Sequence, residues 1–363
     1  IAVFDGKIQS VGPMSEAPPD EDVYDACGMT LYPGFIDAHC HLGMWEDGLG
    51  FEGDDGNEET DPVTPQLRAI DAINPLDRTF REAVAGGITT VLTGPGSANS
   101  IGGQWAAIKT RGRRIDDMIL KEPIGMKFAL GENPKSVYNE KNQAPNTRMA
   151  TAALIREQLK KAQRYLEDLE RMEEDEECDE PEYDIKCEAL LPVLRREQKA
   201  FFHAHRADDI FTAIRIAKEF DLDLVLCHCT EGHLIADLLK EEGCGIIAGP
   251  ILGDRSKPEL RNLERSGLAK LFEEGIHAGL CTDHPETPIQ YLPLCAGVAV
   301  GAGLDYEEAL KAITIYPARI VGIDDRVGSI KVGKDADFVL YDGDPLSPYH
   351  HPKQVFINGQ KCL

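Results

Sequence analysis

The sequence lacks any long run of apolar residues. No stretch of its 363 residues approaches the roughly 18 consecutive apolar residues of a membrane-spanning helix, so we expect no transmembrane segment. No signal peptide is visible, and the chain begins with Ile1 rather than Met, which leaves its natural start open. The composition, 42% hydrophobic and 28% charged residues, is typical of a soluble globular protein.

Basic residues are also scarce. Lysine and arginine number 38 against 63 aspartates and glutamates, which gives a formal net charge of −25. Nucleic acids and anionic membrane surfaces repel such a chain, so we expect neither as a partner. Solubility explains the excess acid, and a small-molecule substrate is the expected partner.

Paired cysteine motifs are absent. The ten cysteines follow no disulfide-scaffold spacing and include no Cys-x-x-Cys pair. Several of them, including Cys40, Cys227 and Cys281, lie within apolar segments that resemble strands. Buried free thiols suit a reducing compartment, so the sequence predicts a cytoplasmic location.

The middle of the chain alternates between strand and helix patterns. Strands are predicted at residues 35–41, 87–92, 125–130, 200–203, 222–228, 245–248 and 277–283, and helices at 78–85, 152–171, 210–220 and 232–242. Repeated strand–helix units predict a parallel sheet, and about eight units in about 280 residues suit an α/β fold of the (β/α)8 TIM-barrel type. A doubly wound sheet is the alternative, but no glycine-rich dinucleotide loop follows the first strand.

The two ends of the chain share a different character. Residues 1–12 read as a β-hairpin that turns at Asp5-Gly6, and residues 337–341 and 354–360 read as strands. We therefore predict a small β-sandwich domain formed by residues 1–32 and 320–363. The barrel, residues 33–319, is inserted between its two parts.

Histidines and an aspartate follow the predicted strands. The first strand ends in Asp-Ala-His-Cys-His, and strand alternation puts His39 and His41 on one side and Cys40 on the other. His203, His228 and Asp283 end later strands, at the face where barrel enzymes build their active sites. Imidazoles and a carboxylate suit zinc or a similar divalent ion.

These motifs resemble the amidohydrolase superfamily, and most closely its imidazolonepropionase-related members. The similarity covers nearly the whole chain and rests on Pro-Gly-Phe-Ile-Asp-Ala-His-Cys-His at 33–41, His-Ala-His-Arg-Ala-Asp-Asp at 203–209, His-Cys-Thr-Glu-Gly-His at 228–233, Thr-Asp-His-Pro at 282–285 and Val-Gly-Ser-Ile-Lys-Val-Gly-Lys-Asp-Ala-Asp-Phe-Val at 327–339. Together these motifs are specific for the superfamily but not for a substrate. Family members often form dimers or larger assemblies, so a homo-oligomer is an open expectation.

The resemblance implies a role for each residue. His39 and His41 match the metal-binding pair, and His203 and His228 match the histidines after the fifth and sixth strands. Asp283 matches the aspartate that touches both the metal and the catalytic water. A bound metal lowers the pKa of water from 15.7 toward about 7, and Asp283 can take the water's proton and pass it to the leaving nitrogen. His228 either ligates a second ion or hydrogen-bonds the developing oxyanion, so one or two ions, with zinc favoured, are expected.

The ligand that bridges two metals in the family has two candidates here. Glu132 follows the predicted strand at 125–130, and Lys127 lies within it and would need to be carboxylated. A regular strand does not aim both inward, because their positions differ in parity. We prefer Glu132, since it needs no modification.

Substrate contacts are predicted for His205 and Arg206. His205 shares a face with His203, although a hydrogen bond to a metal ligand would explain it equally well. Arg206 suits a substrate carboxylate, with an ion pair to Asp208 or Asp209 as the alternative. The glycine-rich segments 43–58 and 94–104 are predicted to be loops that contact the substrate.

The sequence thus predicts a metal-dependent hydrolase of C–N bonds in an amide or cyclic amide, with a metal-activated water and Asp283 as general base and acid. A deaminase of a cyclic amidine or a dipeptidase would use the same site. A catalytically inactive barrel that binds metal or ligand would not need Asp283. A structural zinc site at Cys227, His228 and Cys229 is disfavoured, because alternation turns both cysteines away from His228.

Overall fold

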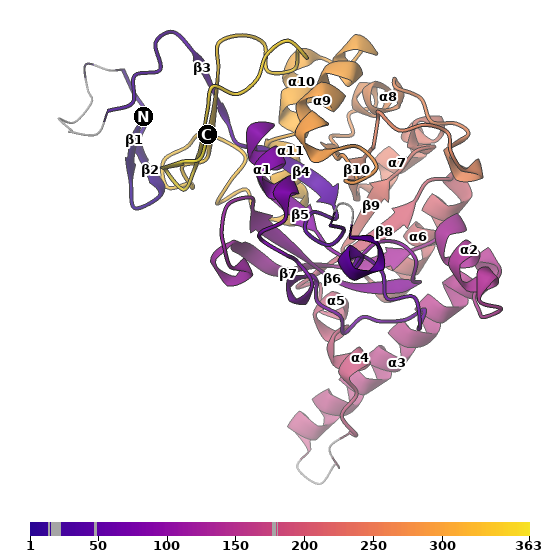
Figure 1. Ribbon diagram of the computed structural model, residues 1–363. Helices are drawn as coiled ribbons and strands as arrows, with labels where there is room; N and C mark the ends of the chain where they lie inside the picture. The colour runs from indigo at the N-terminus through magenta and orange to yellow at the C-terminus, as the bar shows by residue number, and fades with distance from the viewer. Residues whose placement is uncertain (14, 16–22, 47–48, 176–178, 180) are drawn as a thin grey trace.

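The computed structural model describes residues 1–13, 15, 23–46, 49–175, 179 and 181–363 (Figure 1). Its centre is an eight-stranded sheet in the order β11-β10-β9-β8-β7-β6-β5-β4. The strands are β4 (Phe35–Cys40), β5 (Ile88–Thr93), β6 (Ile101–Lys109), β7 (Ile119–Ala129), β8 (Lys199–Ala204), β9 (Leu224–His228), β10 (Gly245–Ala248) and β11 (Gly279–Leu280). Asp283 N donates to His39 O (3.0 Å) and His41 N to His284 O (2.9 Å), so the two edges meet and the sheet closes into the predicted barrel.

One barrel strand runs against the others. β6 pairs antiparallel with both β5 and β7, whereas the remaining neighbours pair in parallel. The expectation of a wholly parallel sheet is therefore wrong at β6. The segment 94–104, expected to be one loop, is a loop only as far as residue 100, because its glycine-rich second half is the start of β6.

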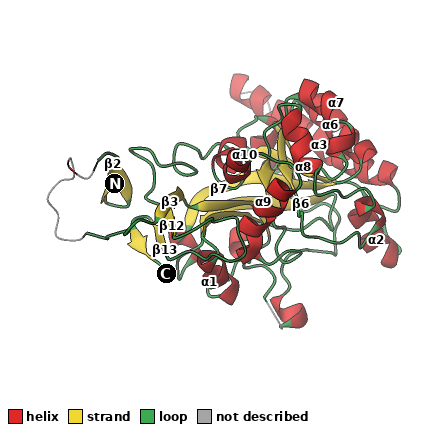
Figure 2. Ribbon diagram, turned by 90° about the horizontal axis from the view of Figure 1, so that it is seen from above, coloured by secondary structure: helices red, strands yellow, loops and turns green. Residues whose placement is uncertain are grey.

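Helices cover the outside of the barrel (Figure 2). They are α1 (Arg78–Ala85), α2 (Glu132–Glu140), α3 (Arg148–Glu174), α4 (Ile185–Glu188), α5 (Leu191–Leu194), α6 (Ala207–Phe220), α7 (Ala236–Glu242), α8 (Gly267–Glu273), α9 (Leu292–Gly301), α10 (Tyr306–Ala312) and α11 (Ile315–Val321). The helix predicted at 152–171 is confirmed within α3, which buries Ile155, Leu159 and Ala162. None of the helices in the described residues is long and apolar enough to cross a membrane.

The chain ends form small sheets at one side of the barrel (Figures 1 and 2). The hairpin is β1 (Ala2–Phe4) and β2 (Lys7–Ser10), and the four-stranded sheet has the order β14-β13-β12-β3, with β3 (Thr30–Pro33), β12 (Phe338–Tyr341), β13 (Gln354–Ile357) and β14 (Gln360–Lys361). β3 pairs antiparallel with β12, so the N-terminal and C-terminal segments share one sheet, as expected. The domain boundaries at residues 32 and 320 stay a prediction.

The barrel interior is filled below the polar strand ends. Side chains of the central strands, including Ile36, Trp105 and Phe201, form one buried apolar cluster together with Val321 of α11. A second, larger cluster lies between the strands and the surrounding helices. The filled interior leaves the carboxyl ends of the strands as the place where polar side chains converge.

Candidate metal and catalytic site

The end of β4 carries the first group of candidate ligands. The β4–β5 register shifts between Asp37 and Cys40, an interval that contains His39, and His39 and His41 both face Asp283. The Nε2 atom of each histidine lies 3.4 Å from Asp283 Oδ1. Cys40 belongs to the outer core, as alternation predicts. We call His39, His41 and Asp283 the carboxylate cluster.

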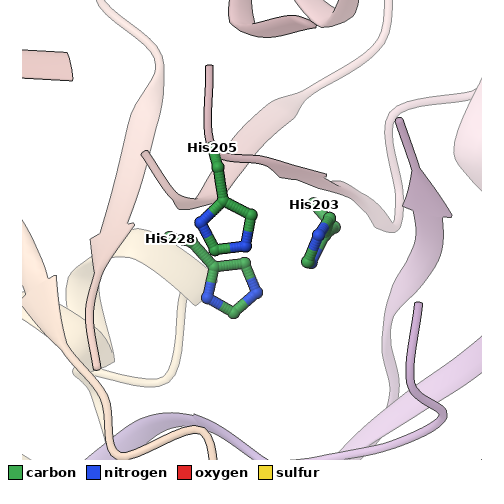
Figure 3. Close-up of side chains that lie close together, drawn as sticks. All are labelled: His203, His205 and His228. Atoms are coloured by element: carbon green, nitrogen blue, oxygen red, sulfur yellow. The ribbon is translucent and has the colours of Figure 1, made fainter. Parts of the chain in front are cut away.

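The ends of β8 and β9 carry the second group. One ring nitrogen from each of His203, His205 and His228 lies within 4.8 Å of the others (Figure 3). The rings of His205 and His228 stack at 16° with centroids 4.7 Å apart, while His203 stands nearly edge-on to both. These three side chains are the imidazole cluster.

Backbone geometry at the end of β9 overturns one expectation. His228 has φ 70° and Cys229 has φ 50°, in the left-handed region that breaks strand alternation. Cys229 does lie in the outer core, but Cys227 lies in the barrel interior, so the prediction that both turn toward the helices is wrong for Cys227. Within the described residues, neither group of possible metal ligands includes a cysteine.

Hydrogen bonds determine which ring nitrogen of His41 and of His228 stays free to bind a metal. His41 Nδ1 donates to Gly94 O (2.6 Å), and His228 Nδ1 donates to Gly249 O (3.0 Å). A carbonyl oxygen only accepts, so Nε2 of each ring keeps its lone pair. Such a bond is the usual way to orient a metal-binding histidine.

His203 and His205 differ in this respect. Both nitrogens of His203 are buried without a hydrogen bond. His205 Nδ1 lies 2.7 Å from Thr230 Oγ1, and its Nε2 lies 3.6 Å from Glu259 Oε1. His203 therefore has both ring nitrogens to offer a ligand, whereas Nδ1 of His205 is already engaged by Thr230.

The charge states of these groups suit a cation. Burial lowers the pKa of His39, His203 and His205 well below the ordinary value and that of His228 to about 4, so neutral lone pairs are present at neutral pH. Burial would raise the pKa of Asp283, but the nearby imidazoles of His228, His39 and His41 hold it well below its usual range. Asp283 is thus an ionised carboxylate.

The two candidates for a bridging ligand occupy different places. Lys127 is fully buried on β7, with Nζ 3.3 Å from His39 Nε2, and burial lowers its pKa. Glu132 begins α2, where its carboxylate accepts from Glu259 N (3.2 Å) and its own N donates to Glu259 Oε2 (2.9 Å). Lys127 therefore lies against the carboxylate cluster, while Glu132 ties α2 to the loop after β10.

A cavity of about 430 Å³ opens over both clusters. Trp45 and Asn57 from the segment 43–58, and Ser97 from the segment after β5, line it, as expected for substrate loops; residues 47 and 48 lie outside the described residues. Arg206 is not among the lining residues and instead forms two hydrogen bonds with Asp208 (2.9 and 2.8 Å), as the alternative interpretation held.

Sequence reasoning missed two charged residues in the loop after β10. Lys257 lines the cavity, and Glu259 is buried at 1% exposure, with Oε1 3.7 Å from His203 Nε2. Lys257 precedes a 3-10 helix of only three residues, Pro258–Leu260, which contains Glu259, and a helix this short has no periodicity that would mark a residue. The only available signal was their position after a predicted strand on the catalytic face.

Comparisons with known proteins agree with this fold. Residues 195–362 match the amidohydrolase family. A solved amidohydrolase from Thermotoga maritima MSB8 is 43% identical, with a TM-score of 0.97 over 100% of this chain and 94% of that chain. Amidohydrolase TasK of Hapsidospora irregularis is 32% identical over 97% of this chain, which spans 38% of TasK; imidazolonepropionase of Shewanella frigidimarina is 26% identical, covering 94% of this chain and 85% of that protein.

The chain belongs to the amidohydrolase family. The superfamily comprises hydrolases and deaminases that generally use divalent metals, and the donor set here fits such an ion. Neutral buried imidazoles, two unbonded nitrogens on His203 and one ionised carboxylate are the groups that zinc and related ions prefer.

Proposed function

We propose that this protein is a metal-dependent hydrolase of C–N bonds in amides or cyclic amides. The observation that carries the proposal is the position of Asp283. One carboxylate oxygen contacts both His39 and His41, the other lies 4.0 Å from His228 Nδ1, and the residue lines the cavity. A carboxylate held between two groups of metal ligands at a substrate cavity is placed for proton transfer.

Two ions fit the donor set. His39, His41 and Asp283 would hold one, and His203 and His228 the other. Lys127, once carboxylated, would supply an anionic oxygen to both, and its burial and lowered pKa favour the neutral amine that reacts with carbon dioxide. Bound zinc lowers the pKa of water and polarises a carbonyl group.

Asp283 would perform the proton transfers. Its low pKa keeps it ionised at neutral pH, so it accepts a proton from the attacking water and donates that proton to the leaving nitrogen. His41 and His228 are oriented through their Nδ1 atoms by backbone carbonyls, which keeps their Nε2 atoms directed as ligands. The similarity to imidazolonepropionase supports C–N bonds, cyclic ones included, as targets.

A screen tests this proposal directly. Zinc-loaded protein and chelator-treated protein are compared on lactams, N-acyl amino acids, dipeptides and cyclic amidines. We expect hydrolysis of at least one class by the zinc-loaded form, and restoration of activity when zinc is returned to the treated form. Release of ammonia from amidines alone would assign a deaminase, and zinc-independent activity would refute the proposal.

A further inference from the structure

We propose that Lys257 binds a carboxylate of the substrate, so that the preferred substrates are amides with a free carboxylate near the scissile C–N bond. This inference rests on the proposed hydrolytic function and names the substrate class for that site.

Lys257 is placed at the cavity as a single cation. Among the described residues that line the cavity, it is the only lysine or arginine. Its side chain is 28% exposed, so the ammonium is partly withdrawn from bulk water but still open to a ligand. With a net charge of −25, the chain as a whole repels anions, so binding of one here needs a local cation.

The ammonium is held in place without being saturated. Its Nζ donates to Asn133 Oδ1 (3.0 Å) and lies 2.9 Å from Glu259 Oε1. An ammonium has three N–H donors, and even if the ion pair with Glu259 takes one beside the bond to Asn133, one donor is left for a ligand. Asn133 in turn donates to Ser97 Oγ (2.7 Å), and both line the cavity. The cation is therefore oriented before a substrate arrives, which reduces the entropic cost of binding.

The same contacts place Lys257 beside the reaction site. Glu259 Oε1 lies 2.9 Å from the ammonium and 3.7 Å from His203 Nε2, so one carboxylate oxygen neighbours both groups. The loop is fixed by the two hydrogen bonds between Glu132 and Glu259. A carboxylate bound to Lys257 therefore lies a short distance from the imidazole cluster. In an N-acyl amino acid, only one carbon atom separates the carboxylate from the amide nitrogen. Such a substrate suits a carboxylate subsite at Lys257 close to the imidazole cluster.

Glu59 and Glu286, which also line the cavity, are not paired with Lys257 and do not compete with a substrate carboxylate for its ammonium. Glu59 is paired with Lys141 Nζ at 2.8 Å, and Glu286 is an exposed residue of the cavity wall. Charge-assisted hydrogen bonds to a carboxylate are about twice as strong as neutral ones, so one such bond is enough to discriminate an acid from its amide.

Isothermal titration of the zinc-loaded protein with N-acetyl-L-leucine and with N-acetyl-L-leucinamide tests the proposal. We expect the acid to bind about tenfold more tightly than the amide. Lys257→Met should bring the acid to the affinity of the amide and leave the amide unchanged, and Lys257→Gln should behave alike. Lys270→Met, which removes a lysine paired with Glu264 outside the cavity lining, is the matched control and should keep the preference.

Two results would overturn the proposal. One is a wild-type protein that binds both compounds equally or binds neither. The other is a preference for the acid that survives in both Lys257 variants at unchanged zinc content, which would place the carboxylate elsewhere, for instance directly on the metal. The titration reports binding and the substrate screen reports hydrolysis, so a protein that prefers the acid but hydrolyses nothing would refute the proposed function and retain this subsite.

Discussion

The carboxylate cluster and the imidazole cluster differ in the charge that they bring to a cation. The first includes Asp283, an ionised carboxylate 3.4 Å from two imidazoles. The second consists of neutral rings, and the nearest carboxylate, Glu259, is paired with Lys257 at 2.9 Å. Opposite charges attract more strongly than a neutral donor does, so the first cluster should hold its ion more tightly. Binding of a second ion at the imidazole cluster should therefore depend on an added anionic ligand. Carboxylated Lys127 is the side chain placed to supply that ligand.

The largest effect is expected from removing the carboxylate of Asp283, which is proposed both to bind the metal and to transfer the proton. Asp283→Asn should lower kcat about 10²–10⁴-fold, because the amide cannot accept the proton. The variant should keep much of its metal, since the imidazoles remain. Steady-state kinetics and elemental analysis on the same sample check this. Near-normal turnover would assign the proton transfer to another group.

The second prediction separates Lys127 from Glu132. Lys127→Met should abolish binding of the second ion and lower kcat about 100-fold, because the anionic bridge is lost. Glu132→Gln keeps an amide oxygen that can accept the bond from Glu259 N, so its metal content should stay normal. Bicarbonate should raise the metal content of the wild type but not of Lys127→Met. Loss of metal in Glu132→Gln alone would restore Glu132 as the bridge.

The third prediction divides the imidazole cluster itself. His203→Asn should remove the second ion, because both ring nitrogens of His203 are unbonded in the fold. His205→Asn should keep that ion and weaken its affinity about tenfold, since His205 Nδ1 is already engaged by Thr230 Oγ1. Metal titration in the presence of a competing chelator measures both. Equal losses in the two variants would make His205 a ligand as well.

The smallest effect concerns the stability of metal-free protein. Burial lowers the pKa of His228 from 6.5 to about 4. As pH falls from 6.5 toward 4, the unfolded chain takes up a proton that the folded chain does not, so the free energy of unfolding decreases over this window and is unaffected by this group above it. Burial lowers the pKa of His39, His203 and His205 in the same direction, so these residues add to the decrease. Thermal unfolding of chelator-treated protein should show the decrease, and His228→Asn should make it shallower without abolishing it. A Tm that rises toward pH 4 would contradict the assignment.

The carboxylate cluster was largely predictable from sequence. Strand alternation alone put His39 and His41 on one side and Cys40 on the other, and the structure confirms this. The prediction holds although the β4–β5 register shifts between Asp37 and Cys40, an interval that contains His39. The two-residue alternation of side chains reliably predicts which face a residue occupies where the strand stays extended.

The imidazole cluster was less predictable. The left-handed backbone at His228 and Cys229 is invisible to a two-residue period, so the position of Cys227 was predicted wrongly. The antiparallel strand β6 was missed because Gly102 and Gly103 at its start resemble a loop. Lys257 and Glu259 reach the site through the irregular segment after β10, and only the tertiary fold brings such residues to a cavity.

The metal content of freshly purified protein tests the central claim most directly. Elemental analysis should find divalent metal, approaching two ions per chain with zinc and bicarbonate present. Thermal unfolding should show a higher Tm for the zinc-loaded form than for the chelator-treated form. A protein that contains no metal, and whose Tm does not rise when zinc is added, would contradict the account.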